Sequence, residues 1–277
     1  MPDVFKINEE PSEEEFDLYK YYADNPNNFS KWYEFIKDNG VIDVPRTVYF
    51  KTPEEVVKAC FLEKPNRDYE IIIKWLKETV IPELTKQKML GICTIKNGTF
   101  SNKFDSKYMH QVITPSSWIN LAYALANINY MAEMVDTNGL AEFVVREDIM
   151  ARFKRIMPCI YNGLPLTNEY RVFYDFDKHR VCYIVNYWDK EYCLDSIKAN
   201  DYTDGFVFEH FAPEIEKHFQ ENKDNIADLV GKALKNVKMT GQWSVDILER
   251  PDGKLYLIDM ALANQSAYYD PDKMEEK

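Results

Sequence analysis

Two aspartates near the end of the sequence, Asp246 and Asp259, interrupt segments that are otherwise apolar. The segments read WSVDIL and KLYLIDM, and the turn-forming residues Arg-Pro-Asp-Gly at 250–253 lie between them. A hairpin with a loop of about four residues would place the two aspartates opposite or nearly opposite each other. Facing carboxylates destabilise a sheet unless a cation lies between them or one is protonated. The spacing therefore predicts a Mg²⁺ site with carboxylate ligands, and the alternative is two aspartates on the solvent face of the hairpin.

A loop of small residues between Lys96 and Lys103 could bind phosphate groups. It follows the apolar segment CTIK and contains Gly98, Thr99 and Ser101. A lysine at the end of a strand can reach phosphates while the backbone N–H groups of such a loop donate hydrogen bonds to them. The Asn-Gly dipeptide in the loop also predicts a hairpin turn. Lysines at hairpin ends are common without any function, so this alternative stays open.

The segment EYRVF places Glu169 and Arg171 two residues apart, which puts both side chains on one face of a strand. The planar guanidinium of an arginine binds a phosphate or a carboxylate through two hydrogen bonds. Arg171 is therefore a candidate for binding an anionic ligand. The alternative is an ordinary surface ion pair between the two side chains.

The pattern of apolar residues along the chain predicts an α+β fold. The expected strands occur mostly in adjacent pairs, which favours antiparallel sheets. Regular alternation of strands and helices is missing and no GxGxxG occurs, so a Rossmann sheet is disfavoured. We expect two short helices within 16–38, longer helices after Thr52 and at 69–87, 115–134 and 212–237, and strands within 41–50, 89–96, 140–145, 169–188 and 243–260.

Composition excludes several classes of protein. The net charge of −12 disfavours a surface that binds nucleic acid without sequence preference, since such binding needs many cationic contacts. Five cysteines without a CxxC, and four histidines without ligand spacing, predict neither a disulfide framework nor a zinc site. The acidic start of the sequence does not resemble a signal peptide, and no segment approaches the roughly 20 apolar residues of a membrane span. We therefore expect a cytoplasmic protein with reduced thiols.

In their order along the chain, these segments resemble the ATP-grasp fold. The resemblance covers roughly residues 42–269, and its specificity lies in the order of short motifs. They are VPRT at 44–47, CTIK followed by NGTFSNKF, EFVVREDI at 142–149, EYRVF at 169–173 and the hairpin WSVDILERPDGKLYLIDM. The combination of PLTNEYRVF, YIVNYW, WSVDI and LYLIDM also resembles a divergent branch of that fold that includes an assembly chaperone for a eukaryotic translation initiation factor, and small phage or bacterial proteins.

The resemblance implies two lobes with mainly antiparallel sheets and a nucleotide between them. Residues 1–41 would form an acidic arm and N-terminal helices, 42–147 the N-terminal and central lobe, and 148–277 the C-terminal lobe with the metal-binding hairpin. The implied cofactors are ATP and Mg²⁺. The implied site residues are Lys96 and Lys103 for phosphates, Val145, Arg146, Glu147 and Ile149 for the adenosine, Arg171 and Lys103 for catalysis, and Asp246 and Asp259 for the metal.

One position departs from the motif. Members of the fold usually have an asparagine two residues after the last acidic metal ligand, and this sequence has Ala261 there. Asn264 could supply the missing ligand if the chain loops back.

The resemblance implies an ATP- and Mg²⁺-dependent ligase that activates a carboxylate substrate as an acyl phosphate for attack by an amine or similar nucleophile. The first alternative is a chaperone or adaptor that binds a nucleotide and a protein partner and does not catalyse ligation. A nucleic-acid-modifying ligase of the same fold is the second, disfavoured by the net charge. A membrane partner is not expected.

Overall fold

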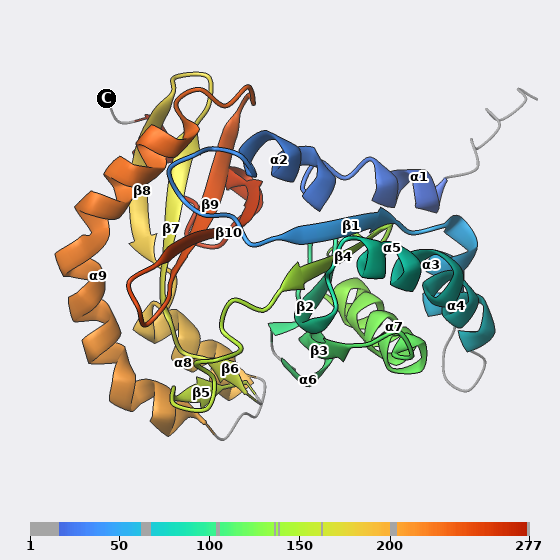
Figure 1. Ribbon diagram of the computed structural model, residues 1–277. Coiled ribbons are helices and arrows are strands. Elements are labelled where there is room, and N and C mark those ends of the chain that lie inside the picture. Colours follow the sequence, from blue (N-terminus) through green and yellow to red (C-terminus); the bar gives the residue numbers. More distant parts are fainter. Residues whose placement is uncertain are drawn as a thin grey trace, which may run out of the picture.

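The computed structural model of the chain contains two four-stranded sheets (Figure 1). Residues of both sheets line one pocket. The structure describes residues 17–61, 68–103, 106–135, 137, 139–161, 163–199 and 204–275. All strand pairs within the two sheets are antiparallel. The α+β fold with two lobes that we expected from the sequence is therefore confirmed. Among the described residues, no helix is both long and apolar enough to cross a membrane.

The first sheet has the strand order β1-β4-β2-β3, and helices cover one of its faces (Figure 1). Its strands are β1 (Thr47–Lys51), β2 (Gly91–Asn97), β3 (His110–Ile113) and β4 (Glu142–Glu147). The helices are α3 (Glu54–Phe61), α4 (Tyr69–Trp75), a π-helical turn (Leu76–Val80), α5 (Ile81–Lys86), α6 (Ser106–Met109) and α7 (Trp118–Met134). Cys93 and Ile95 of β2 pack into the helical core, so their neighbours Thr94 and Lys96 face the pocket.

The second sheet has the strand order β10-β9-β7-β8, with a long helix along one face (Figure 1). Its strands are β7 (Asn168–Asp175), β8 (Arg180–Asn186), β9 (Gln242–Glu249) and β10 (Leu255–Leu262), and the helix is α9 (Gly205–Leu234). Val172 and Val245 pack with the apolar side of α9, which turns Arg171 and Asp246 toward the pocket. The remaining elements are β5 (Cys159–Ile160), β6 (Leu164–Pro165), α8 (Lys190–Ala199), a 3₁₀ turn (Ala263–Gln265) and α10 (Pro271–Glu275).

Of the two short N-terminal helices, the second packs against both lobes and the first against the first lobe alone. They are α1 (Leu18–Ala23) and α2 (Phe29–Ile36). Phe29 and Trp32 are fully buried in a core that also contains Val144 of the first sheet and Val245 of the second. In the loop before α2, the side chain of Asn27 accepts a hydrogen bond from the N–H of Leu262 at 2.6 Å and donates one to Gln265. The segment 17–41 is therefore part of the structural unit that holds the pocket.

The prediction of a hairpin turn at Asn97-Gly98 is wrong. Strand β2 pairs with β3 and β4, and a loop and the short helix α6 separate β2 from β3. The side chain of Asn97 accepts hydrogen bonds from the N–H groups of Thr99 and Phe100, at 3.1 and 2.7 Å. This side-chain turn competes with the two-residue hairpin and directs the chain away from β2.

Candidate functional site

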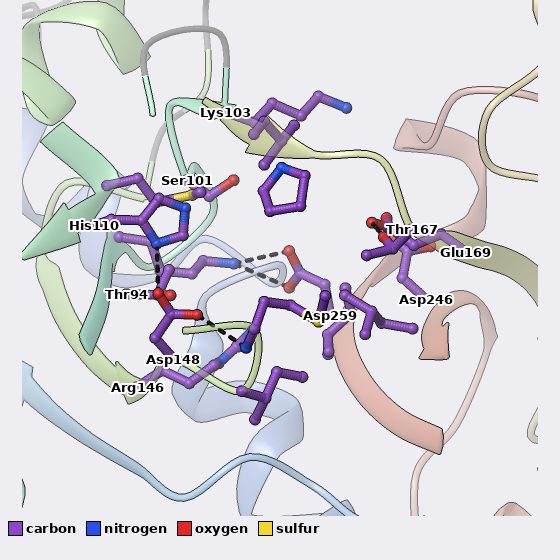
Figure 2. Close-up of a pocket in the computed structure, with 18 of the residues that line it drawn as sticks. Thr94, Ser101, Lys103, His110, Arg146, Asp148, Thr167, Glu169, Asp246 and Asp259 are labelled. Atoms are coloured by element: carbon purple, nitrogen blue, oxygen red, sulfur yellow. Dashed lines mark hydrogen bonds and ion pairs between the residues drawn. The ribbon is translucent and has the colours of Figure 1, made fainter. Parts of the chain in front are cut away.

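A pocket of about 150 Å³ lies between the lobes, and most of the residues singled out in the sequence line it (Figure 2). One end is formed by the segment after β4, with Asp148, Ile149 and Met150. The opposite end carries the charged residues of the second sheet. Figure 2 shows His110 and Asp148 at the first end, Asp246 and Glu169 at the other, and Asp259 between them. The full lining comprises Thr94, Lys96, Ser101, Lys103, Met109, His110, Arg146, Glu147, Asp148, Ile149, Met150, Leu164, Pro165, Thr167, Glu169, Tyr187, Trp188, Asp246, Leu248, Ile258 and Asp259.

Asp246 and Asp259 face each other across β9 and β10, as the sequence predicted. Regular pairing continued from Leu257, which lies opposite Ile247, would have placed Asp259 opposite Val245. A bulge at Ile258 shifts the register by one residue and brings Asp259 opposite Asp246. The irregularity in β10 is therefore what creates the carboxylate pair.

Each of the two carboxylates is bound by one buried cation. Lys96 Nζ lies 3.0 and 2.9 Å from the two carboxylate oxygens of Asp259. Arg171 donates from Nε and Nη2 to the two oxygens of Asp246, both at 2.8 Å. These pairs neutralise the like charges that face each other in the hairpin. The alternative of two aspartates on a solvent face is therefore wrong, and so is a surface pair between Glu169 and Arg171.

Burial and the paired carboxylate have opposite effects on the pKa of each of the two cations. Burial lowers the pKa of Lys96 below its usual value, although Asp259 opposes this effect. Burial alone would also lower the pKa of Arg171, but Asp246 raises it above its usual value.

The two carboxylates suit a magnesium ion whose other ligands are phosphate oxygens and water. Among the described residues, no three His, Cys, Asp or Glu side chains cluster closely enough to enclose a metal. Mg²⁺ usually takes one or two carboxylates from the protein and keeps water and phosphate oxygens as its other ligands. Asp246 and Asp259 match that requirement. Asn264, the expected third ligand, is exposed and lines no described pocket at this site.

A second pocket of about 210 Å³ adjoins the first at its charged end. Ser101, Lys103, Tyr187, Asp246 and Asp259 line both pockets. The second pocket is otherwise lined by Thr99, Phe100, Arg171, Ser244, Met260, Ala261, Gln265, Ser266 and Ala267. The position where an asparagine was expected, Ala261, thus borders this second space. The two pockets therefore meet at the carboxylate pair.

Tyr187 organises two cations at the boundary of the pockets. Lys103 Nζ donates a hydrogen bond to the Tyr187 hydroxyl and lies 4.6 Å from the centre of its ring. The guanidinium carbon of Arg171 lies 4.9 Å from the same ring centre. Stacking on an aromatic face stabilises such cations. The sequence analysis did not name Tyr187 as a site residue, because it follows β8 and reaches the site only through the fold.

Glu169 is a further acidic residue of the first pocket. The Thr167 hydroxyl donates to its carboxylate at 2.6 Å. Burial raises the pKa of Glu169 to about 7, against the opposing effect of Thr167. This carboxyl group can therefore exchange a proton near neutral pH.

Some residues at the end of β4 line the pocket, and others lie in the core. Arg146, Glu147 and Ile149 line the pocket, as expected. Val145 lies opposite Val48 and Ile95 and is fully buried in the core of the first lobe, so its side chain does not line the pocket. Val145 and its neighbour Arg146 point to opposite faces, as neighbouring side chains of a strand do.

The backbone of the loop after β2 does not form the cradle that we expected. The N–H of Gly98 donates to the carbonyl of Gly139 at 2.8 Å, and those of Thr99 and Phe100 donate to Asn97. A Cβ atom at Gly98 would lie 2.4 Å from the Asn28 side chain, so this glycine serves packing. Phosphate binding here would therefore depend on side chains, chiefly those of Lys96 and Lys103.

His110 and Asp148 line the pocket at the end formed by the segment after β4, and Lys154 pairs with Asp148. Asp148 Oδ2 lies 3.0 Å from His110 Nδ1 and 2.7 Å from Lys154 Nζ. Burial alone would raise the pKa of Asp148, but His110 and Lys154 lower it to about 2. The sequence showed no ligand spacing for this histidine, and only the pairing of β3 with β2 brings it to the segment after β4.

Comparison with known proteins gives distant structural neighbours. No protein-family model matches the sequence, and no curated protein sequence matches it significantly. Cdc123 from Schizosaccharomyces pombe is 13% identical, with a TM-score of 0.49 over 90% of this chain and 88% of that one. The VanG D-Ala:D-Ser ligase from Enterococcus faecalis is 11% identical, with a TM-score of 0.43 over 91% and 57%. A RimK domain ATP-grasp protein from Sphaerobacter thermophilus is 11% identical, with a TM-score of 0.35 over 88% and 60%.

ATP-grasp proteins are thus among the structural neighbours of the chain, as the sequence motifs predicted. The chain spans less than two thirds of the length of the two bacterial proteins. At these identities the similarity concerns the fold and carries no substrate or activity over to this chain.

Proposed function

We propose that the chain is an ATP- and Mg²⁺-dependent ligase that activates a carboxylate as an acyl phosphate. One observation carries the proposal: Asp246 and Asp259 face each other between two pockets, each with a buried cation on both of its oxygens. Paired carboxylates with adjacent lysine and arginine are the groups that a magnesium–triphosphate complex requires. The cytoplasmic location remains an expectation from the sequence.

In this proposal the nucleotide occupies the first pocket. Its base lies near Ile149 and its phosphates reach Lys96 and Lys103. When bound, Mg²⁺ would be held by Asp246 and Asp259 and would neutralise charge on the phosphates. The two lysines bind and orient the phosphates, and Arg171 stabilises the transferring phosphoryl group or the substrate carboxylate.

The second pocket is the proposed place of the carboxylate substrate. A carboxylate oxygen there would attack the γ-phosphorus, and ADP would leave. An amine or similar nucleophile would then attack the acyl carbon, lose a proton and release phosphate. Ser244 and Ser266, whose hydroxyls lie 2.6 Å apart, and Gln265 supply polar groups that could orient such a substrate.

A nucleotide-binding chaperone or adaptor without turnover is the second candidate. Ala261 favours it, because the side chain at this position borders the second pocket and offers no metal ligand. In that case a protein partner would replace the carboxylate substrate.

A nucleic-acid-modifying ligase is less well supported. Lys154 is paired with Asp148, and Arg146 is half-buried with its guanidinium carbon 5.5 Å from the centre of the Phe29 ring. These two cations therefore do not contribute to an exposed basic groove.

Thermal unfolding with ADP or ATP, with and without Mg²⁺, tests the nucleotide site. Ligand at about 100 times its dissociation constant should stabilise the protein by about 2.7 kcal/mol. No stabilisation of the wild-type protein would contradict the proposal. A shift that persists unchanged in the double variant Asp246→Asn, Asp259→Asn would contradict the metal assignment. ADP formation with a panel of carboxylates and amines would then separate the ligase from the adaptor, which predicts binding without turnover.

A further inference from the structure

Arg146 lies near the end of β4 and lines the first pocket (Figure 2). It lies opposite Thr94 of β2, and Lys96 follows two residues later on that strand. Side chains two residues apart on a strand share one face of the sheet, so Arg146 and Lys96 face the pocket from neighbouring strands. The guanidinium carbon of Arg146 lies 5.5 Å from the centre of the Phe29 ring, a distance at which an aromatic face stabilises a cation.

Arg146 differs from two other cations of the site, because it has no carboxylate partner. Lys96 Nζ binds both carboxylate oxygens of Asp259. Arg171 binds both oxygens of Asp246. Among the described residues, the guanidinium of Arg146 makes no hydrogen bond or ion pair, and its Nε is shielded from solvent.

The chemistry of a guanidinium limits what can satisfy Arg146. An arginine stays protonated in proteins and can only donate hydrogen bonds. A buried donor without an acceptor destabilises a protein, and such atoms are unusual unless a ligand or water satisfies them. A ligand group that satisfies Nε must therefore accept a hydrogen bond, and a negatively charged group would balance the positive charge as well.

Arg146 and Lys96 are attracted to the same carboxylate, that of Asp259. Burial lowers the pKa of both cations below the usual values, and the charge of Asp259 opposes this effect in each. Lys96 occupies both oxygens of Asp259, so that carboxylate forms no ion pair with Arg146. A magnesium ion at Asp259, as in the proposed function, would add further positive charge. The phosphates of a nucleotide would supply the negative charge that is missing.

We propose that Arg146 binds a phosphate oxygen of the nucleotide, as a third cation beside Lys96 and Lys103. The inference rests on the proposed function and extends it, since the sequence motif implied a contact with the adenosine. A guanidinium can donate two parallel hydrogen bonds to one phosphate, whereas the ammonium of a lysine acts as a point charge. Arg146 is thus a binding residue for the phosphates, and the ring of Phe29 positions it.

Calorimetric titration with ADP in the presence of Mg²⁺ tests this role. Arg146→Met should bind ADP at least about tenfold more weakly than the wild type, because a charge-assisted hydrogen bond is lost. Arg155→Met is the matched control, since Arg155 is exposed and lines no described pocket, and its affinity should stay within about twofold of the wild type. An Arg146→Met affinity within that range, or an equal loss in both variants, would overturn the proposal. If the wild type does not bind ADP, the proposed function itself fails.

Pyrophosphate separates a contact with the phosphates from a contact with the base, because it carries phosphate groups and no base. Its dissociation constant, measured by competition with ADP in the presence of Mg²⁺, should rise at least about tenfold in Arg146→Met. An unchanged affinity for pyrophosphate beside weaker binding of ADP would assign Arg146 to the base and overturn the proposal. A wild-type protein that binds ADP and no pyrophosphate would overturn it too. Should Arg146→Met not fold, Arg146→Gln removes the charge and keeps a polar side chain, with the same expected losses.

Discussion

The two ion pairs of the site differ in what they connect. Arg171 and Asp246 are direct neighbours on β7 and β9, so their contact belongs to one sheet. Lys96 and Asp259 come from different lobes, from β2 and β10, and are 163 residues apart in the sequence. Asp259 is 35% exposed, whereas the side chains of Arg171 and Asp246 are 13% and 10% exposed. The first pair is therefore fixed by sheet register, and the second depends on how the lobes sit against each other.

This difference suggests which contact yields when a ligand arrives. A metal or phosphate that enters the pocket meets the partly exposed Asp259 before it meets the buried Asp246. Burial already weakens the charged state of Lys96. We therefore expect the contact between the lobes to open first, while the pair within the sheet holds the hairpin in place.

Removal of Arg171 should have the largest effect on stability. Arg171→Met leaves Asp246 buried without its cation, and we expect a loss of about 3–5 kcal/mol in the free energy of unfolding. Chemical denaturation measures it. The double variant Arg171→Met, Asp246→Leu should recover most of the loss. Lys217→Met, which breaks an exposed pair with Glu221, is the control and should change stability by less than about 1 kcal/mol. A similar small loss in Arg171→Met would contradict the structural role of this pair.

Glu169 should make the stability of the second lobe depend on pH. Its pKa in the folded protein is about 7, above the usual 4.5, so the folded chain binds more protons than the unfolded chain between these values. Stability is then fully present below about pH 4.5 and falls as the pH rises to 7. Glu169→Gln should remove this slope, a difference of about 1–3 kcal/mol between pH 5 and 7.5. Parallel pH profiles for the variant and the wild type would show that Glu169 is better solvated than the structure indicates.

Loss of Asp259 should destabilise less than loss of Arg171, by about 1–2 kcal/mol at pH 7. Lys96 would lose its partner, but its lowered pKa allows it to release its proton. In Asp259→Asn the unfolded chain then binds more protons than the folded chain below the usual lysine pKa of about 10.4, so stability rises with pH. Denaturation at pH 7 and 9.5 measures this recovery relative to the wild type. A variant whose deficit grows at high pH would contradict it.

Tyr187 should show the smallest effect, because its ring remains when only the hydroxyl is removed. Tyr187→Phe loses the hydrogen bond from Lys103 but keeps both cations over an aromatic ring, and we expect a loss of about 1 kcal/mol. Tyr187→Leu should lose about 1 kcal/mol more, since the contacts with both cations disappear. Equal stability of the two variants would show that the ring does not hold these cations.

The sequence predicted those features that depend on local patterns. Turn residues and apolar spacing indicated that Asp246 would face Asp259, and periodicity indicated the main helices and the antiparallel strands. The bulge at Ile258 was not visible, yet it sets the final register. A strand pattern with one extra residue still alternates on either side of it, so the sequence alone does not mark its position.

Features that depend on contacts between distant segments could not be read from the sequence. His110, Asp148 and Tyr187 reach the pocket because β3, the segment after β4 and the end of β8 converge on it. Val145 was expected in the site and lies in the core, since a motif does not show which face of a strand each residue occupies. Asn97 appeared as part of a hairpin turn, although its side chain closes a different turn.

The position of the metal tests the central claim most directly. Crystals of the chain grown with ADP and Mn²⁺ in place of Mg²⁺ would give an anomalous signal at the metal. The account predicts a peak between the carboxylates of Asp246 and Asp259, with ADP in the pocket and its phosphates at Lys96 and Lys103. A nucleotide bound elsewhere, or a peak that is not coordinated by either aspartate, would contradict it.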